Sequence, residues 1–232
     1  RDGSTRDDLV LPPDTWVFEP RVRYTWWAIT SAGREWGAEV FYPRWEGFAA
    51  SVEAGLDLRS DPSAWGGVAG QDAPRNRPGT SIVLVRQSVR AGRTVSPRVR
   101  LQLEQHAAWG RGEDDLTRVR AGGLNPYVVA IPGVPWAALL SERLVAAQAS
   151  VHLRPSLGRA HEVGVALAGG AFNDVHRTGR LDTYGGALGA MAFADLRFGR
   201  WQGYTRVGYG LPLGAFAGAV RVSVMVGLGA SF

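Results

Sequence analysis

The sequence predicts an all-β protein built from one antiparallel sheet. Successive segments alternate apolar residues with small or charged ones at every second position, which is the period of a strand with one apolar face. The last segment, residues 220–232, shows this best, because every even position from Val220 to Phe232 is apolar. We find no ten-residue stretch with a convincing helical period. The predicted organisation is an irregular polar segment over residues 1–15 followed by a single β domain over residues 16–232.

Turn-forming residues divide the alternating pattern into separate strands. We expect eleven strands, at residues 21–30, 34–42, 45–59, 80–91, 98–109, 116–122, 143–154, 161–174, 186–198, 203–211 and 220–232. Residues 60–79 hold four Gly and three Pro and are expected to form a long surface loop.

Two features decide between a soluble barrel and a membrane barrel. The polar face of the expected strands collects Arg, Asp and Glu, whereas the apolar face is almost free of charge, as a barrel in lipid requires. Aromatic residues lie at or near expected strand ends, where the amphipathic rings of Trp and Tyr favour the membrane–water interface. These residues are Trp26, Trp27, Trp36, Trp45, Trp109, Trp201, Tyr42, Tyr184 and Phe198. We therefore expect a transmembrane β-barrel in a bacterial outer membrane, with lipid against its apolar face.

A closed barrel of this class limits both the number of strands and the kind of side chains that can fill its lumen. Single-chain bacterial barrels have an even number of strands, so we expect about twelve, the twelfth near residues 15–19, with ten as the alternative. Opposite charges in a narrow lumen should pair, because an unpaired buried charge is costly. The expected lumen network comprises Arg118, Arg120, Arg154, Asp174, Arg197, Glu104 and Glu162.

One apolar loop interrupts the alternation. Residues 123–141 contain three prolines and many apolar side chains, and loops that face water are rarely so apolar. We expect this segment to fold into the lumen or onto the membrane surface. The residues expected to plug the lumen are Ile131, Pro132, Gly133 and Trp136.

Composition argues against several other classes of protein. The chain has no cysteine and no apolar run long enough for a membrane helix. Its net charge of +5 is the difference between 26 basic residues, all of them Arg, and 21 acidic ones. Because these are spread along the strands without a basic arm or a recognition helix, we expect no nucleic-acid partner. The spacing of the four His residues predicts no metal site, and no cofactor motif is present.

The second half of the chain resembles the C-terminal barrel of the BamA/TamA-type superfamily of outer-membrane insertases and two-partner secretion transporters. Residues 118–124 look like the strand before that family's inward-folding loop, and residues 142–155 look like the strand after it. The sequence Phe172-Asn-Asp174 resembles the family's aromatic-x-Asp motif, and residues 226–232 resemble its ending, with Phe232 as the closing-strand signal.

The resemblance covers about residues 116–232. It implies a role in outer-membrane biogenesis, lipid organisation or transport, with a periplasmic or membrane protein partner that supplies the periplasmic domains missing here. The family's loop arginine has no counterpart between Asn125 and Glu142. Asp174 is therefore expected to pair with Arg154 or Arg197.

Two alternatives remain open: a lipid-modifying hydrolase and a small-solute pore. The candidate catalytic residues are His106, His152, His161 and His176, together with Ser150, which shares a face with His152. Side chains at i and i+2 on a strand lie about 7 Å apart, which is too far for direct proton transfer unless the strand bends. We therefore expect a hydrogen-bond network rather than a catalytic site, and a non-enzymatic protein. The crowded lumen disfavours the pore.

Overall fold

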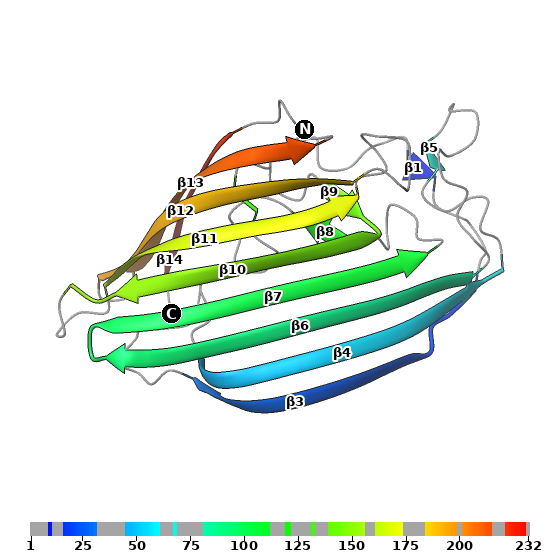
Figure 1. The fold of residues 1–232 in the computed structure, drawn as a ribbon, viewed down its shortest axis with the longest axis horizontal. Coiled ribbons are helices and arrows are strands. Elements are labelled where there is room, and N and C mark those ends of the chain that lie inside the picture. Colours follow the sequence, from blue (N-terminus) through cyan, green and yellow to red (C-terminus); the bar gives the residue numbers. More distant parts are fainter. Residues whose placement is uncertain are drawn as a thin grey trace.

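The computed structural model describes residues 9–10, 16–31, 45–60, 67–68, 81–111, 119–121, 131–132, 139–155, 161–173, 184–198, 201–214 and 221–230. Fourteen strands lie within these ranges (Figure 1). No helix long and apolar enough to cross a membrane occurs in them.

Ten of the strands form one antiparallel sheet in the order β14-β13-β12-β11-β10-β7-β6-β4-β2, with β3 also paired to β4. Their bounds are β2 Val17–Phe18, β3 Arg21–Ser31, β4 Trp45–Arg59, β6 Ser81–Ser96, β7 Val99–Arg111, β10 Arg143–Leu153, β11 Glu162–Asn173, β12 Tyr184–Phe198, β13 Trp201–Gly214 and β14 Val222–Ala230. Two small sheets pair β1 (Leu9–Val10) with β5 (Gly67–Val68) and β8 (Val119–Ala121) with β9 (Leu139–Ser141).

The all-β, antiparallel prediction is confirmed, and nine of the eleven expected long segments match strands of the main sheet. A strand also lies near the position expected for the twelfth, at β2. The expected strand at 34–42 falls outside the described residues. Within them, β14 and β3 are not paired with each other, so closure into a barrel stays a prediction.

The expected strand at 116–122 does not join the main sheet. It is represented by β8, three residues long, which pairs with β9 instead. The reason is that β7 already pairs directly with β10, from Arg143 opposite Trp109 to Leu153 opposite Val99. No edge of β7 is left for another strand.

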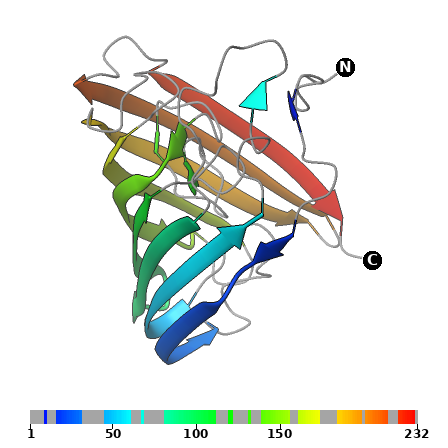
Figure 2. The same ribbon diagram turned by 90° about the vertical axis from the view of Figure 1, so that its right-hand side faces the viewer.

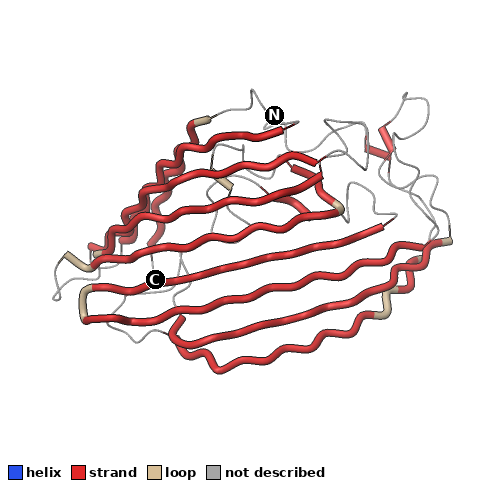
Figure 3. Tube along the Cα trace, in the orientation of Figure 1, coloured by secondary structure: helices blue, strands red, loops and turns tan. Residues whose placement is uncertain are grey.

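The sheet is strongly curved (Figures 2 and 3). The lengths of its connections follow from the bounds of the strands. At one end, residues 97–98 join β6 to β7 and residues 199–200 join β12 to β13, and the connections between β3 and β4 (residues 32–44) and between β10 and β11 (residues 154–161) lie at the same end. At the other end, residues 60–80 separate β4 from β6, and residues 112–142 separate β7 from β10 and include β8 and β9. The last strand, β14, runs toward the end that holds residues 97–98.

The two faces of the sheet have opposite character, and we call them the outer and the inner face. The outer face exposes large apolar side chains, among them Leu101, Leu103, Val145, Val165, Leu167, Leu188, Val207, Tyr209, Val224, Val226 and Leu228. The inner face buries polar and charged ones, among them Asp57, Arg59, Arg100, Gln102, Ser150, His152, Arg154, Glu162 and Arg206. A water-soluble sheet protein shows the reverse arrangement.

Candidate functional site

The inner face of β10 and β11 brings three chemically active side chains together. Ser150 and His152 lie two residues apart on β10, and Glu162 begins β11. All three are buried, at 5%, 0% and 2% exposure respectively. We call this group the Ser150 relay.

Two hydrogen bonds in series connect the three side chains of the relay. The Ser150 Oγ lies 2.8 Å from the His152 Nε2, and the His152 Nδ1 bonds the Glu162 Oε1. When the Nδ1–H donates to the carboxylate, Nε2 is the acceptor for the serine hydroxyl. This is the order of nucleophile, base and orienting carboxylate found in hydrolytic triads.

The prediction that Ser150 and His152 are too far apart is wrong. The spacing of about 7 Å describes side chains that stand perpendicular to the strand. An imidazole is long enough to lie along the strand, and the His152 ring does so toward Ser150. Glu162, expected only as a member of the lumen network, was not linked to either residue by any sequence signal, because their contact depends on the β10–β11 register.

An aromatic ring covers one side of the relay. The rings of His152 and Phe193 have centroids 4.8 Å apart. This packing needs a glycine between them: a Cβ at Gly164, which faces His152 across the ladder, would lie 2.3 Å from the Phe193 ring and 2.4 Å from the Val151 carbonyl oxygen. Phe193 also belongs to a buried apolar cluster with Ala166 and Met191.

Two polar side chains of β7, Arg100 and Gln102, lie on the other side of the relay, and we call them the polar wall. Gln102 is directly opposite Ser150 in the ladder, and Arg100 is directly opposite His152. The Arg100 Nε donates to the Gln102 Oε1 at 3.2 Å, and the Arg100 Nη1 lies 3.7 Å from the Glu46 Oε2. The relay is therefore flanked by an apolar cluster on the β12 side and by hydrogen-bond donors on the β7 side.

The other residues of the expected lumen network are scattered. Arg154 is buried on the inner face beside the relay, and on β7 the Glu104 Oε2 lies 3.9 Å from the His106 Nε2. The backbone of Arg120 lies in β8, and that of Arg197 in β12, but their side chains are outside the described part. Arg118 and Asp174 also lie outside it. Arg206, not expected in the network, is buried and lies 3.5 Å from Asp195.

Two residues of the expected plug lie against the inner face. Ile131 is fully buried in a cluster with Leu144, Ala146, Phe172 and Ala187, which belong to β10, β11 and β12. Pro132 is also buried and packs close to Gly189, where an added Cβ would lie 2.7 Å from the Pro132 Cβ. Gly133 and Trp136 are outside the described residues, as is Phe232.

Asn173, the middle residue of the Phe172-Asn-Asp174 sequence, has a structural role. Its Oδ1 accepts from the Arg143 backbone N–H at 2.8 Å and from the Ser141 hydroxyl at 2.9 Å. The bond fixes the start of β10 to the end of β11. Nothing in the alternation pattern identifies it.

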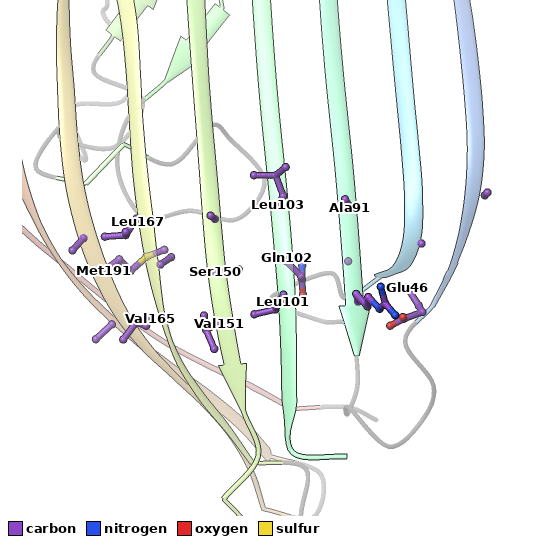
Figure 4. Close-up of a pocket in the computed structure, with 18 residues that line it drawn as sticks. Glu46, Ala91, Leu101, Gln102, Leu103, Ser150, Val151, Val165, Leu167 and Met191 are labelled. Atoms are coloured by element: carbon purple, nitrogen blue, oxygen red, sulfur yellow. The ribbon is translucent and has the colours of Figure 1, made fainter. Parts of the chain in front are cut away.

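An apolar pocket of about 1090 Å³ lies on the sheet across β3 to β12. Its larger lining side chains include Leu101, Leu103, Val151, Val165 and Leu167 (Figure 4). Small residues such as Ala149, Ala190 and Ala192 make the hollow between them. Ser150, Gln102 and Met191 also line the pocket, although most of its lining side chains are on the outer face.

No group of three or more His, Asp or Glu side chains suited to a metal ion occurs among the residues whose positions are described. No family model matches the chain, and no curated protein is significantly similar to it.

Proposed function

We propose that the chain is a β-barrel protein of a bacterial outer membrane. The observation that carries this proposal is the inverted polarity of the sheet, with apolar side chains exposed on one face and charged ones buried on the other. Burial of apolar surface is the main favourable term in folding. A sheet that leaves Leu167, Val226 and Leu228 exposed needs another apolar medium to cover them, and lipid tails supply it.

The lengths of the strands and their connections fit this placement. The long strands have between 9 residues, in β14, and 16 residues, in β6, and a tilted strand of about 9–11 residues crosses the hydrocarbon core. Outer-membrane barrels have short periplasmic turns and longer extracellular loops. By that rule the end with the turn at residues 97–98 faces the periplasm, and β14 ends there.

The inner face supports a lumen that conducts poorly. Arg100 and Arg206 are fully buried there, and Ile131 packs against β10, β11 and β12 from the inner side. Together with the resemblance to the BamA/TamA-type superfamily, this favours a role in outer-membrane biogenesis, lipid organisation or transport. The same resemblance favours a periplasmic or membrane protein as its partner.

The membrane placement can be tested by site-directed spin labelling, since the chain has no native cysteine. Val224 and Ser223 are neighbours on β14 that face outward and inward. In reconstituted vesicles, a label at Val224→Cys should be accessible to oxygen, which dissolves in lipid, and protected from a water-soluble nickel complex. The matched Ser223→Cys label should not show that pattern. Equal access of the nickel complex to both labels would overturn the proposal.

The role of the loop can be tested separately by conductance. In planar bilayers we expect the wild-type protein to be silent and a deletion of residues 128–138 to open. Steady conductance from the wild-type protein would contradict the closed lumen and favour the small-solute pore. The deletion leaves the outer face intact, so the spin-label result should be unchanged in it.

A further inference from the structure

We propose that the Ser150 relay is a hydrolytic site for carboxylic esters with an apolar acyl chain. This activity goes beyond the proposed membrane role and does not depend on it. The three residues are held in sequence by hydrogen bonds from Ser150 to His152 and from His152 to Glu162. Their burial excludes bulk water, which strengthens each of these interactions.

The relay provides each proton transfer that ester hydrolysis needs. The Ser150 Oγ attacks the carbonyl carbon while its proton passes to the His152 Nε2. The bond to the alcohol then breaks, and Nε2 returns the proton to the departing alkoxide. Water attacks the acyl-serine with His152 again as base, and release of the carboxylic acid returns the proton to Ser150. Glu162 is a positioning residue, since it holds the imidazole in the tautomer that accepts at Nε2.

The polar wall on β7 is placed to stabilise the negative charge that develops on the carbonyl oxygen. Gln102 and Arg100 are the ladder partners of Ser150 and His152. The Gln102 Oε1 accepts from Arg100, so the donor end of this amide is its NH₂ group. Donors fixed in a water-poor site stabilise an oxyanion more strongly than solvent does.

The apolar cluster on the other side determines the class of substrate. Ala166, Met191 and Phe193 adjoin the relay on β11 and β12, and Met225 on β14 packs against them. Four adjacent strands span about 14 Å at the usual spacing of a sheet. That length matches the length of a medium-length acyl chain lying across the strands, and the apolar side chains favour it over a short polar one. Because the Ser150 hydroxyl is on the inner face, the ester approaches from that side.

The test uses the full chain in detergent micelles with a fluorescent fluorophosphonate, which reacts with activated serines. We expect the adduct on Ser150 by mass spectrometry, and at least about a 100-fold loss of labelling in Ser150→Ala. Ser88→Ala is the matched control, because Ser88 is also on the inner face but bonds only another hydroxyl, Ser51, at 2.7 Å. Its labelling should stay within about twofold of the wild type. Far-UV circular dichroism establishes that each variant is folded.

Turnover is measured with p-nitrophenyl octanoate and p-nitrophenyl acetate. We expect the octanoate ester to be cleaved at least about tenfold faster. We expect Glu162→Gln to lower kcat by about 100-fold or more while KM changes by about twofold or less, as removal of an orienting carboxylate does. A folded wild-type protein that gives no Ser150 adduct, or equal labelling in Ser150→Ala, would overturn the inference. The spin-label experiment would be unaffected by that failure.

Discussion

The inner face of the sheet is stabilised differently over its first strands and over its later ones. On β3 and β4, the Arg23 Nη2 pairs with the Glu53 Oε2 at 2.9 Å, with 66% of the Arg23 side chain and 14% of the Glu53 side chain exposed. On β10 and β11, the Ser150 relay makes its bonds at no more than 5% exposure. The same face therefore holds a solvated ion pair at one place and a desolvated hydrogen-bond chain at another.

This difference shows that solvent exposure, rather than the type of residue, decides what a glutamate does here. An ion pair in contact with water adds little stability, because solvent already satisfies both charges. A buried pair is costly to break, because the partner left behind has no solvent to replace the lost group. Glu53 and Glu162 look alike in the sequence, yet only the second should be essential.

The largest expected effect comes from truncating each of these two glutamates. Glu162→Ala should lower the free energy of unfolding by about 2–4 kcal/mol, since the buried His152 Nδ1–H loses its acceptor and the truncation leaves a cavity. Glu53→Ala should cost about 1 kcal/mol or less. Urea unfolding in micelles, followed by tryptophan fluorescence, measures both. Equal losses would show that the two parts of the inner face are equally solvated.

Two glycines on the inner face offer a second comparison. Gly164→Ala places a Cβ 2.4 Å from the Val151 carbonyl oxygen and 2.3 Å from the Phe193 ring, and backbone cannot move aside cheaply. We expect a loss of about 1–3 kcal/mol. Gly55→Ala meets only the flexible side chains of Leu84 and Arg21, at 3.2 Å or more, and should cost about 1 kcal/mol or less.

The same unfolding measurement separates the two glycine variants. In addition, Gly164→Ala should displace the Phe193 ring from His152 and reduce fluorophosphonate labelling of Ser150, whereas Gly55→Ala should not. A tolerated Gly164→Ala variant with normal labelling would mean that the ring is not needed to hold the imidazole.

The strands could be predicted from the sequence because a period of two is a local signal. The segments expected at 45–59 and 143–154 match β4 and β10 to within a residue, since each position's polarity reports the face on which it lies. The same signal does not indicate which strands pair with one another in the sheet. It placed residues 116–122 in the sheet, whereas β7 and β10 pair directly and β8 lies elsewhere.

The candidate site could be predicted only in part, for a related reason. Ser150, His152 and Glu162 were each assigned to the polar face, which the structure confirms. Whether the three side chains can form hydrogen bonds with one another depends on the β10–β11 register and on how far an imidazole extends along its strand. Gly164 shows the same limit, because a glycine in a strand gives no indication that an aromatic ring from the next strand will cross it.

The smallest expected effect concerns the solvated pair itself. Arg23→Gln removes one partner of Glu53, and because Arg21 also contacts this carboxylate, at 3.5 Å, the loss should be about 0.5 kcal/mol. The loss should shrink further at about 1 M salt, where the Debye length falls to about 3 Å. Unfolding of the wild type and of Arg23→Gln at low and high salt measures this. The cost of Glu162→Ala should not fall with salt, because ions do not reach a buried pair, and a parallel decrease in both variants would show that water enters the Ser150 relay.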